Sequence, residues 1–252
     1  MELYKRTDIY DLLETEERYQ AVKTHWQTLQ ELAKFDTLLD CSIGSGNLTL
    51  PLCELGVQVF GSDLSSEMLE ACDKKAKNRS LSVELRQSDF RRLSEAFDRQ
   101  FDCVASTGNS LPHVENRDVL LALEQMDKLV KPGGYLYYDM RNWDKILKER
   151  NRFYLYNPQF LEDARLNLMQ VWDYNPDGSM TFHLLYTFER DGRIFQKEKF
   201  EETYFPIRRS LLLDKLEKMG YVNLKIMCHP AQLTGVAAES ADWYCVLAQK
   251  KG

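Results

Sequence analysis

The sequence lacks the cysteine spacings that mark metal sites. It has six cysteines: Cys41, Cys53, Cys72, Cys103, Cys228 and Cys245. They form no C-x-x-C pair and no cysteine–histidine spacing typical of zinc ligands. Most of them lie in apolar segments with a strand-like or helix-like pattern, where a reduced cysteine packs as a small hydrophobic side chain. We therefore expect neither a bound metal nor a disulfide framework.

Long apolar runs and an excess of positive charge are missing too. No apolar stretch follows Met1, and no run approaches the roughly 20 residues that cross a bilayer. The sequence thus predicts a cytoplasmic protein without a membrane partner. A formal net charge of −6 disfavours a nucleic-acid partner, because duplex binding normally needs a basic face. A small molecule is the expected partner, and a homo-oligomer stays open.

The composition that is present fits one large α/β domain with an insertion. The chain has 252 residues, of which 44% are hydrophobic and 29% are charged, enough for a sizeable core and a solvated surface. No internal repeat, low-complexity segment or long linker interrupts the pattern.

Residues 37–63 carry the most informative pattern. A short apolar run ends at Asp40, Gly44 and Gly46 open a helix-like segment over 47–55, and a second β-rich run ends at Asp63. Glycines let the backbone approach a ligand closely, and a carboxylate after the next strand can accept the hydroxyls of a ribose. The dinucleotide fingerprint would need a third glycine where Thr49 stands, so a pyrophosphate is disfavoured. The pattern favours S-adenosylmethionine (SAM), which has a ribose and no pyrophosphate.

Four motifs occur in an order that resembles the class I SAM-dependent methyltransferases. They are D-C-S-I-G-S-G (40–46), D-L-S-S-E-M-L (63–69), Q-S-D-F (87–90) and L-V-K-P-G-G-Y-L (129–136). The resemblance implies a doubly wound, mostly parallel Rossmann-like sheet of seven strands, with the ligand at the carboxyl ends of the strands. The alternation of apolar patterns along the chain agrees with this α/β fold.

The expected organisation has four parts. Residues 1–36 form an amphipathic helical segment, 37–140 the SAM-binding core, 141–204 an antiparallel β insertion that serves as a substrate lid, and 205–252 the end of the core. The predicted helices span 65–77, 116–130 and 209–219, and the predicted strands after residue 63 span 81–88, 101–107, 134–140, 169–174, 180–190, 193–204, 222–227 and 242–249.

The resemblance also assigns residues to the cofactor. It implies that Asp89 lies near the adenine amino group, that Phe90 stacks on the adenine, and that Arg18, helped by His113, binds the methionine carboxylate. The remaining residues expected to contact SAM are Asp40, Gly44, Gly46, Asp63, Leu64 and Thr107.

Two further motifs resemble the glycine N-methyltransferases: T-G-N-S-L-P-H (107–113) and D-M-R-N-W-D (139–144). The resemblance implies that Asn109 and Arg141 hold an amino-acid substrate, with Tyr186 and either Tyr156 or Tyr154 lining the pocket. An arginine fork suits a small carboxylate, and tyrosine hydroxyls can accept from an amine. The predicted reaction is methyl transfer to the amine of glycine or sarcosine.

Methyl transfer from a sulfonium needs no acid–base pair, because alignment of the unprotonated amine supplies much of the rate. The proton acceptor stays open between solvent, a tyrosine and His183. Two other functions also stay open. The same fold could methylate another small metabolite, because the pocket and not the fold decides the substrate, or it could bind SAM without turnover. Formation of S-adenosylhomocysteine with a panel of amino acids separates the three.

Overall fold

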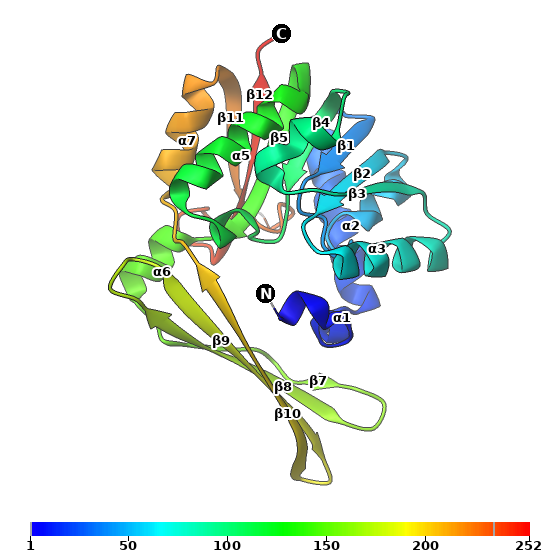
Figure 1. Ribbon diagram of the computed structural model, residues 1–252, viewed down its shortest axis with the longest axis vertical. Helices are drawn as coiled ribbons and strands as arrows, with labels where there is room; N and C mark the ends of the chain where they lie inside the picture. The colour runs from blue at the N-terminus through cyan, green and yellow to red at the C-terminus, as the bar shows by residue number, and fades with distance from the viewer. Residues whose placement is uncertain (1, 234) are drawn as a thin grey trace.

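The computed structural model describes residues 2–233 and 235–252 and contains two β-sheets (Figure 1). The larger sheet has seven strands in the order β11-β12-β5-β4-β1-β2-β3. Strands β1 to β5 pair in parallel, while β12 is antiparallel to both β5 and β11. Their bounds are β1 Thr37–Asp40, β2 Gln58–Asp63, β3 Val83–Gln87, β4 Phe101–Ser106, β5 Val130–Arg141, β11 Tyr221–Cys228 and β12 Trp243–Lys250. The predicted doubly wound, mostly parallel sheet is confirmed.

Helices cover both faces of this sheet, because side chains alternate along each strand. Leu38 joins one apolar cluster with side chains of helices α2 (Glu16–Leu32) and α3 (Ser66–Asn78). Its neighbour Leu39 joins a second cluster with side chains of α4 (Leu93–Ala96), α5 (Asn116–Leu129) and α7 (Arg209–Lys218). The helical segments after residue 33 are η3 Leu50–Leu55, α3 Ser66–Asn78, η4 Phe90–Arg92, α4 Leu93–Ala96, η5 Leu111–His113, α5 Asn116–Leu129, α6 Trp143–Glu149 and α7 Arg209–Lys218.

The N-terminal segment is a series of short turns followed by one long helix. Its elements are η1 Leu3–Lys5, α1 Thr7–Tyr10, η2 Asp11–Leu13 and α2 Glu16–Leu32. Thr15 caps α2 by accepting a hydrogen bond from the backbone of Arg18. In Figure 1 the turns that include α1 lie in the space between the two sheets. Residues 3–10 are therefore placed next to both sheets.

The smaller sheet is antiparallel and follows β5 in the chain. Its order is β10-β9-β8-β6, with β7 also paired to β8. The strands are β6 Phe153–Leu155, β7 Gln159–Phe160, β8 Arg165–Tyr174, β9 Met180–Arg190 and β10 Arg193–Tyr204. The inward side chains of β8 and β9 join the same apolar cluster as Leu39 of the core. This sheet is thus packed against the core through a shared hydrophobic interior.

Most predicted elements are confirmed to within a few residues, but several differ. Strand β8 begins at Arg165, four residues earlier than predicted, and strands β6 and β7 were not predicted. The helix expected over 47–55 is a turn followed by the short 3-10 helix η3. Strand β5 begins at Val130, four residues earlier than the pattern indicated, and helix α6 was not predicted. Asn142 starts α6 by accepting a hydrogen bond from the backbone of Lys145. Within the described residues, no helix has both the length and the apolar character that crossing a bilayer requires.

Candidate active site

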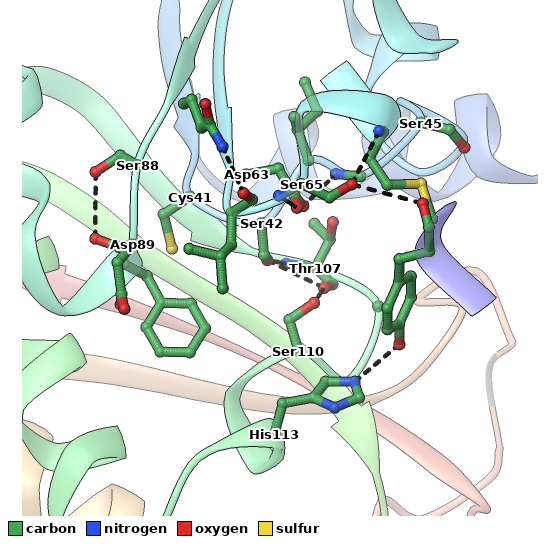
Figure 2. Close-up of a pocket in the computed structure, with 18 of the residues that line it drawn as sticks. Cys41, Ser42, Ser45, Asp63, Ser65, Ser88, Asp89, Thr107, Ser110 and His113 are labelled. Carbon is green, nitrogen blue, oxygen red and sulfur yellow. Dashed lines mark hydrogen bonds between the residues drawn. The ribbon is translucent and has the colours of Figure 1, made fainter. Parts of the chain in front are cut away.

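A cavity of about 360 Å³ opens at the carboxyl ends of β1, β2, β3 and β4. In Figure 2, Asp63 and Ser65 lie on one side of it, Thr107, Ser110 and His113 on another, and Asp89 at one end. The N-terminal turns close part of it, since its lining includes Tyr4, Lys5 and Tyr10. Carboxyl ends of parallel strands are the usual ligand-binding edge of an open α/β sheet.

The glycine turn and Asp63 hold each other in place at this edge. One carboxylate oxygen of Asp63 accepts from the backbone of Gly44 at 3.0 Å, and the other accepts from the backbone of Ser65 at 2.9 Å. Gly44 and Gly46 both have positive φ, +55° and +83°. A Cβ on Gly46 would also lie only 2.7 Å from the Leu50 side chain. Burial raises the pKa of Asp63, and its remaining lone pairs can accept hydroxyl groups from a ligand in the cavity.

Asp40 has a different position. It is fully buried behind the cavity, where Thr49 and Thr107 donate hydroxyl hydrogen bonds to one oxygen and the backbone of Ser42 donates to the other. Burial raises the pKa of Asp40 to about 6. The carboxyl group therefore joins β1, the glycine turn and the end of β4 into one support beneath the cavity.

Asp89, Phe90 and Leu64 line another part of the cavity. Leu64 is 55% exposed, which is unusual for a leucine and leaves its side chain available to a flat ligand. The Asp89 carboxylate already pairs with Arg91, which also reaches Asp118. Hydrogen bonds from Arg91 lower the pKa of Asp89, so this carboxylate is ionised. Part of its capacity to accept hydrogen bonds is already used by Arg91.

His113 connects the cavity to the smaller sheet. Its Nε2 lies 2.9 Å from the hydroxyl of Tyr4, and its ring centre lies 4.4 Å from that of Tyr204 in β10. Burial lowers the pKa of His113 to about 4, so the imidazole is neutral near pH 7. A neutral His113 can offer a hydrogen bond to a ligand but no positive charge.

A second cluster lies around Arg141, at the carboxyl end of β5. The side chain is only 7% exposed, and its Nη2 donates to the hydroxyl of Tyr156 at 3.1 Å and to the amide oxygen of Gln170 at 3.4 Å. The guanidinium carbon lies between 5.1 and 5.7 Å from the centres of four aromatic rings: Tyr154, Trp172, Phe182 and Trp243. Rings from four strands, β6, β8, β9 and β12, thus enclose one cation.

Asn109 links the two groups of residues. Its side-chain oxygen accepts from the backbone of Arg141 and from the indole of Trp143, both at 3.1 Å. It has a φ of +62° and directly follows Gly108, which lines the cavity. A second link runs through aromatic rings, because Tyr204 contacts both His113 and Phe182, with centre distances of 4.4 and 4.7 Å. The cluster around Arg141 is therefore the neighbour of the cavity.

Comparison with known proteins agrees with this arrangement. Residues 38–134 match the family model described as a methyltransferase domain. The chain is 34% identical over 113 residues to a glycine/sarcosine N-methyltransferase of Parasynechococcus marenigrum, which covers 44% of this chain and 40% of that protein. It is 26% identical over 185 residues to a putative methyltransferase of Bacillus subtilis, which covers 72% of this chain and 70% of that protein.

Solved structures share the whole architecture. A SAM-dependent methyltransferase from Clostridium acetobutylicum superposes with a TM-score of 0.75 over 98% of both chains, at 19% identity. An amino pentose methyltransferase from Micromonospora echinaspora superposes with a TM-score of 0.72, covering 97% of this chain and 96% of that one, at 14% identity. At such identities the likeness concerns the fold.

Residues 38–134 form a class I SAM-dependent methyltransferase domain. SAM is therefore the cofactor of this domain, as the glycine turn and Asp63, the expected ribose acceptor, predicted. The alignment spans less than half the length of the glycine/sarcosine N-methyltransferase from Parasynechococcus marenigrum.

The methyltransferase domain brings together most of the predicted cofactor residues. One cavity is lined by Gly44, Asp63, Leu64, Asp89, Phe90, Thr107 and His113. Asp40 and Gly46 support the turn from behind. Arg18 does not line the cavity; it pairs with Glu14 at 3.2 Å, and its side chain is 49% exposed. Its contact with SAM, like the individual roles of the other residues, stays a prediction.

The predicted substrate residues form the second cluster. The hydroxyl of Tyr156 and the ring face of Tyr154 both contact the guanidinium of Arg141. The two tyrosines that were predicted as alternatives thus lie against the same cation. Tyr186 is 3% exposed on the inner face of β9, with its ring 5.9 Å from that of Phe200. Several residues were missed: Tyr4 at the cavity, and Gln170, Tyr204, Trp172, Phe182 and Trp243 around Arg141. Gln170 could have been found, because it is the polar residue in the inward series of β8 that otherwise reads Leu166, Leu168 and Trp172.

One cluster outside both groups combines histidine and cysteine. Nitrogen and sulfur atoms of His25, His229 and Cys245 lie within 4.8 Å of one another, a grouping that the spacing in the sequence did not reveal. Both nitrogens of His25 already have protein partners, since Nε2 bonds the hydroxyl of Tyr137 and Nδ1 accepts from the backbone of Ala231. Those bonds account for the burial of His25 without an ion.

Proposed function

We propose that this protein transfers a methyl group from SAM to the amine of a small amino acid, glycine or sarcosine. The observation that carries the proposal is the environment of Arg141. A guanidinium that is 7% exposed has left bulk water, and such a charge normally needs an anionic partner. Among the residues that the structure describes, Arg141 has no ion pair.

The aromatic rings around Arg141 favour a guanidinium that binds a ligand over one that is solvated by water. Aromatic faces attract the cation, but they leave most of its N–H groups without strong acceptors. The carboxylate of an amino acid would supply both the missing charge and the missing acceptors. An arginine fork would also fix its orientation, since two parallel hydrogen bonds define a plane.

The hydroxyls of Tyr186 and Tyr204 offer acceptors for the amine end of such a substrate. After burial, the nearby hydroxyls of Tyr156 and Tyr204 are the next causes that raise the pKa of Tyr186. Burial raises the pKa of Tyr186, and it raises the pKa of Tyr204 to about 12, so both hydroxyls are neutral at physiological pH. A neutral hydroxyl oxygen can accept from the amine and hold its lone pair in one direction.

On this proposal, the protein speeds methyl transfer by positioning the substrate amine relative to the methyl group of SAM. When bound, SAM supplies an electrophilic methyl group whose sulfonium leaves as a neutral thioether. Arg141 and Tyr156 would fix the carboxylate, and Asn109 would hold the end of β4 against Arg141 through the bond at 3.1 Å. Orientation of this kind supplies about 7–11 kcal/mol in favourable intramolecular reactions. The glycine/sarcosine N-methyltransferases among the relatives support the choice of acceptor.

The test uses the purified protein with SAM and compares glycine and sarcosine with glycinamide and ethanolamine, which lack the carboxylate. We expect S-adenosylhomocysteine to form fastest with glycine or sarcosine. Arg141→Lys keeps the charge but loses the planar fork, so kcat/KM for glycine should fall about 10- to 1,000-fold while the Kd of SAM stays near the wild-type value.

Arg165→Lys is the matched control, because Arg165 is an exposed arginine on β8 that pairs with Glu189. It should retain wild-type turnover. Full activity of Arg141→Lys, or a best acceptor without a carboxylate, contradicts the proposal and favours another small metabolite. An absence of turnover with every amine, despite SAM binding, favours a binding module.

A further inference from the structure

Gln170 lies at the centre of the Arg141 cluster. It projects from the inner face of β8, is 4% exposed, and makes hydrogen bonds to three different side chains. Its amide oxygen accepts from the indole of Trp172 at 3.0 Å and from Arg141 at 3.4 Å, and its amide nitrogen donates to the hydroxyl of Tyr156 at 3.2 Å. No role in the reaction has so far been assigned to it.

The orientation of this amide follows from its partners. An indole N–H and a guanidinium can only donate, so the group that faces Trp172 and Arg141 must be the amide oxygen. The NH₂ group of Gln170 is then directed to Tyr156. A flipped amide would place donors against two donors and leave the buried oxygen of Gln170 facing Tyr156 alone.

Tyr156 in turn receives two hydrogen bonds. The Nη2 of Arg141 and the Nε2 of Gln170 both donate to its oxygen, at 3.1 and 3.2 Å. A phenol oxygen has two lone pairs, so both are used and the O–H proton is left to donate. The Nε and Nη1 groups of Arg141 are also donors, and neither has a hydrogen-bond partner among the side chains that the structure describes.

We infer that Gln170 is a positioning residue that converts Arg141 and Tyr156 into a site with donors only, and so selects acceptors that carry a carboxylate. The inference rests on the proposed function and deepens it. A carboxylate accepts from every donor of such a site, whereas a primary amide brings an NH₂ group against donors and leaves at least one of them unmatched. Gln170 would thus set discrimination between an amino acid and its amide.

Two substitutions at this position test the inference. Gln170→Met keeps the length of the side chain but removes both hydrogen-bonding groups, which frees the hydroxyl of Tyr156 to accept as well as donate. Gln170→Glu keeps the shape but cannot donate to Tyr156, and it places a carboxylate beside Arg141. Steady-state kcat and KM are measured for glycine and glycinamide, with the Kd of SAM measured by calorimetry.

We expect the preference of Gln170→Met for glycine over glycinamide to fall at least about 10-fold relative to wild type, through a higher KM for glycine. Gln170→Glu should lose more, because its own carboxylate competes with the substrate for Arg141. The Kd of SAM should change less than about threefold in both. Gln196→Met is the matched control, since Gln196 is an exposed glutamine on β10 that bonds Glu198, and its preference should equal that of wild type.

Tyr156→Phe gives an independent measure if the variants at Gln170 do not fold. It should lose preference for glycine to a similar extent, and the double variant with Gln170→Met should lose little more, because both act on one hydroxyl. Wild-type preference in either Gln170→Met or Tyr156→Phe overturns the inference. If the wild-type protein itself does not prefer glycine to glycinamide, the proposed function fails instead, whatever Gln170 does.

Discussion

Three acidic residues at the strand ends show that neighbours, and not residue type, decide what a carboxylate can do. Asp40 is bonded by two hydroxyls and a backbone N–H and faces no ligand space. Both oxygens of Asp89 already accept hydrogen bonds from Arg91. Asp63 accepts only one backbone N–H on each oxygen and lines the cavity. It is the acid of the three with both capacity and access for a ribose.

Removal of this carboxylate should weaken cofactor binding. We expect Asp63→Ala to reduce the affinity for SAM by about 1.5–3 kcal/mol, the range for hydrogen bonds to a charged group. Isothermal calorimetry measures it, with circular dichroism to confirm the fold. Asp73→Ala is the control, since Asp73 lies on the surface of α3 and pairs only with Lys77 in the described structure. An affinity equal to that of the control would remove the ribose assignment.

At the scale of elements, the N-terminal turns help to line the candidate cofactor cavity although they precede the methyltransferase domain in the chain. Asp11 anchors them, because one of its oxygens accepts from Ser45 at 2.8 Å and from Asn47 at 2.9 Å and lies 2.7 Å from Lys75. Ser45 and Asn47 belong to the glycine turn that lines the cavity. The anchor thus joins the covering segment directly to the turn beneath it.

Loss of this anchor should loosen the cover. We expect Asp11→Ala to speed hydrogen exchange over residues 3–13 and to raise the Kd of SAM about 5- to 30-fold, since interactions worth about 1–2 kcal/mol are removed. Asp8→Ala is a control on the same segment, because Asp8 is exposed and pairs with Arg6 of its own turn. Unchanged exchange over 3–13 would show that the turns are held by their apolar contacts instead.

At the scale of the whole molecule, the two sheets share one interior. A single apolar cluster contains Leu39 and Phe60 of the larger sheet together with Trp172 and Phe182 of the smaller one. A shared interior couples the folding of both layers, because neither can open without exposing the other's buried side chains. The smaller sheet is therefore expected to unfold with the core and not before it.

A large-to-small substitution in that interior tests this coupling. Phe182→Ala should lower the free energy of unfolding by about 3–5 kcal/mol, with fluorescence and far-UV dichroism giving coincident transitions in urea. Phe160→Ala is the control, because Phe160 lies on β7 of the same sheet but is 81% exposed. Two separate transitions in the wild-type protein would contradict a shared cooperative unit.

Local patterns in the sequence determined much of this fold. Segments rich in aromatic and β-branched residues, separated by turns, located β9 and β10 at their observed bounds, and the helix predicted over 116–130 ends within one residue of α5. Gly44, Gly46 and Asp63 also lie close together in the chain, so strand–turn–strand geometry alone brings them to one edge. These features depend on neighbours a few residues apart, which is the range over which side-chain periodicity carries information.

Only the tertiary structure decided how distant segments meet. The contact of Tyr4 with His113 joins residues 109 positions apart, and Arg141 is enclosed by rings from β6, β8, β9 and β12. Period and propensity indicate which face of a strand is buried but not which element covers it. That choice depends on packing the two sheets around one interior, and it is this packing that turned Gln170, an ordinary polar residue in the sequence, into a neighbour of Arg141 and Tyr156.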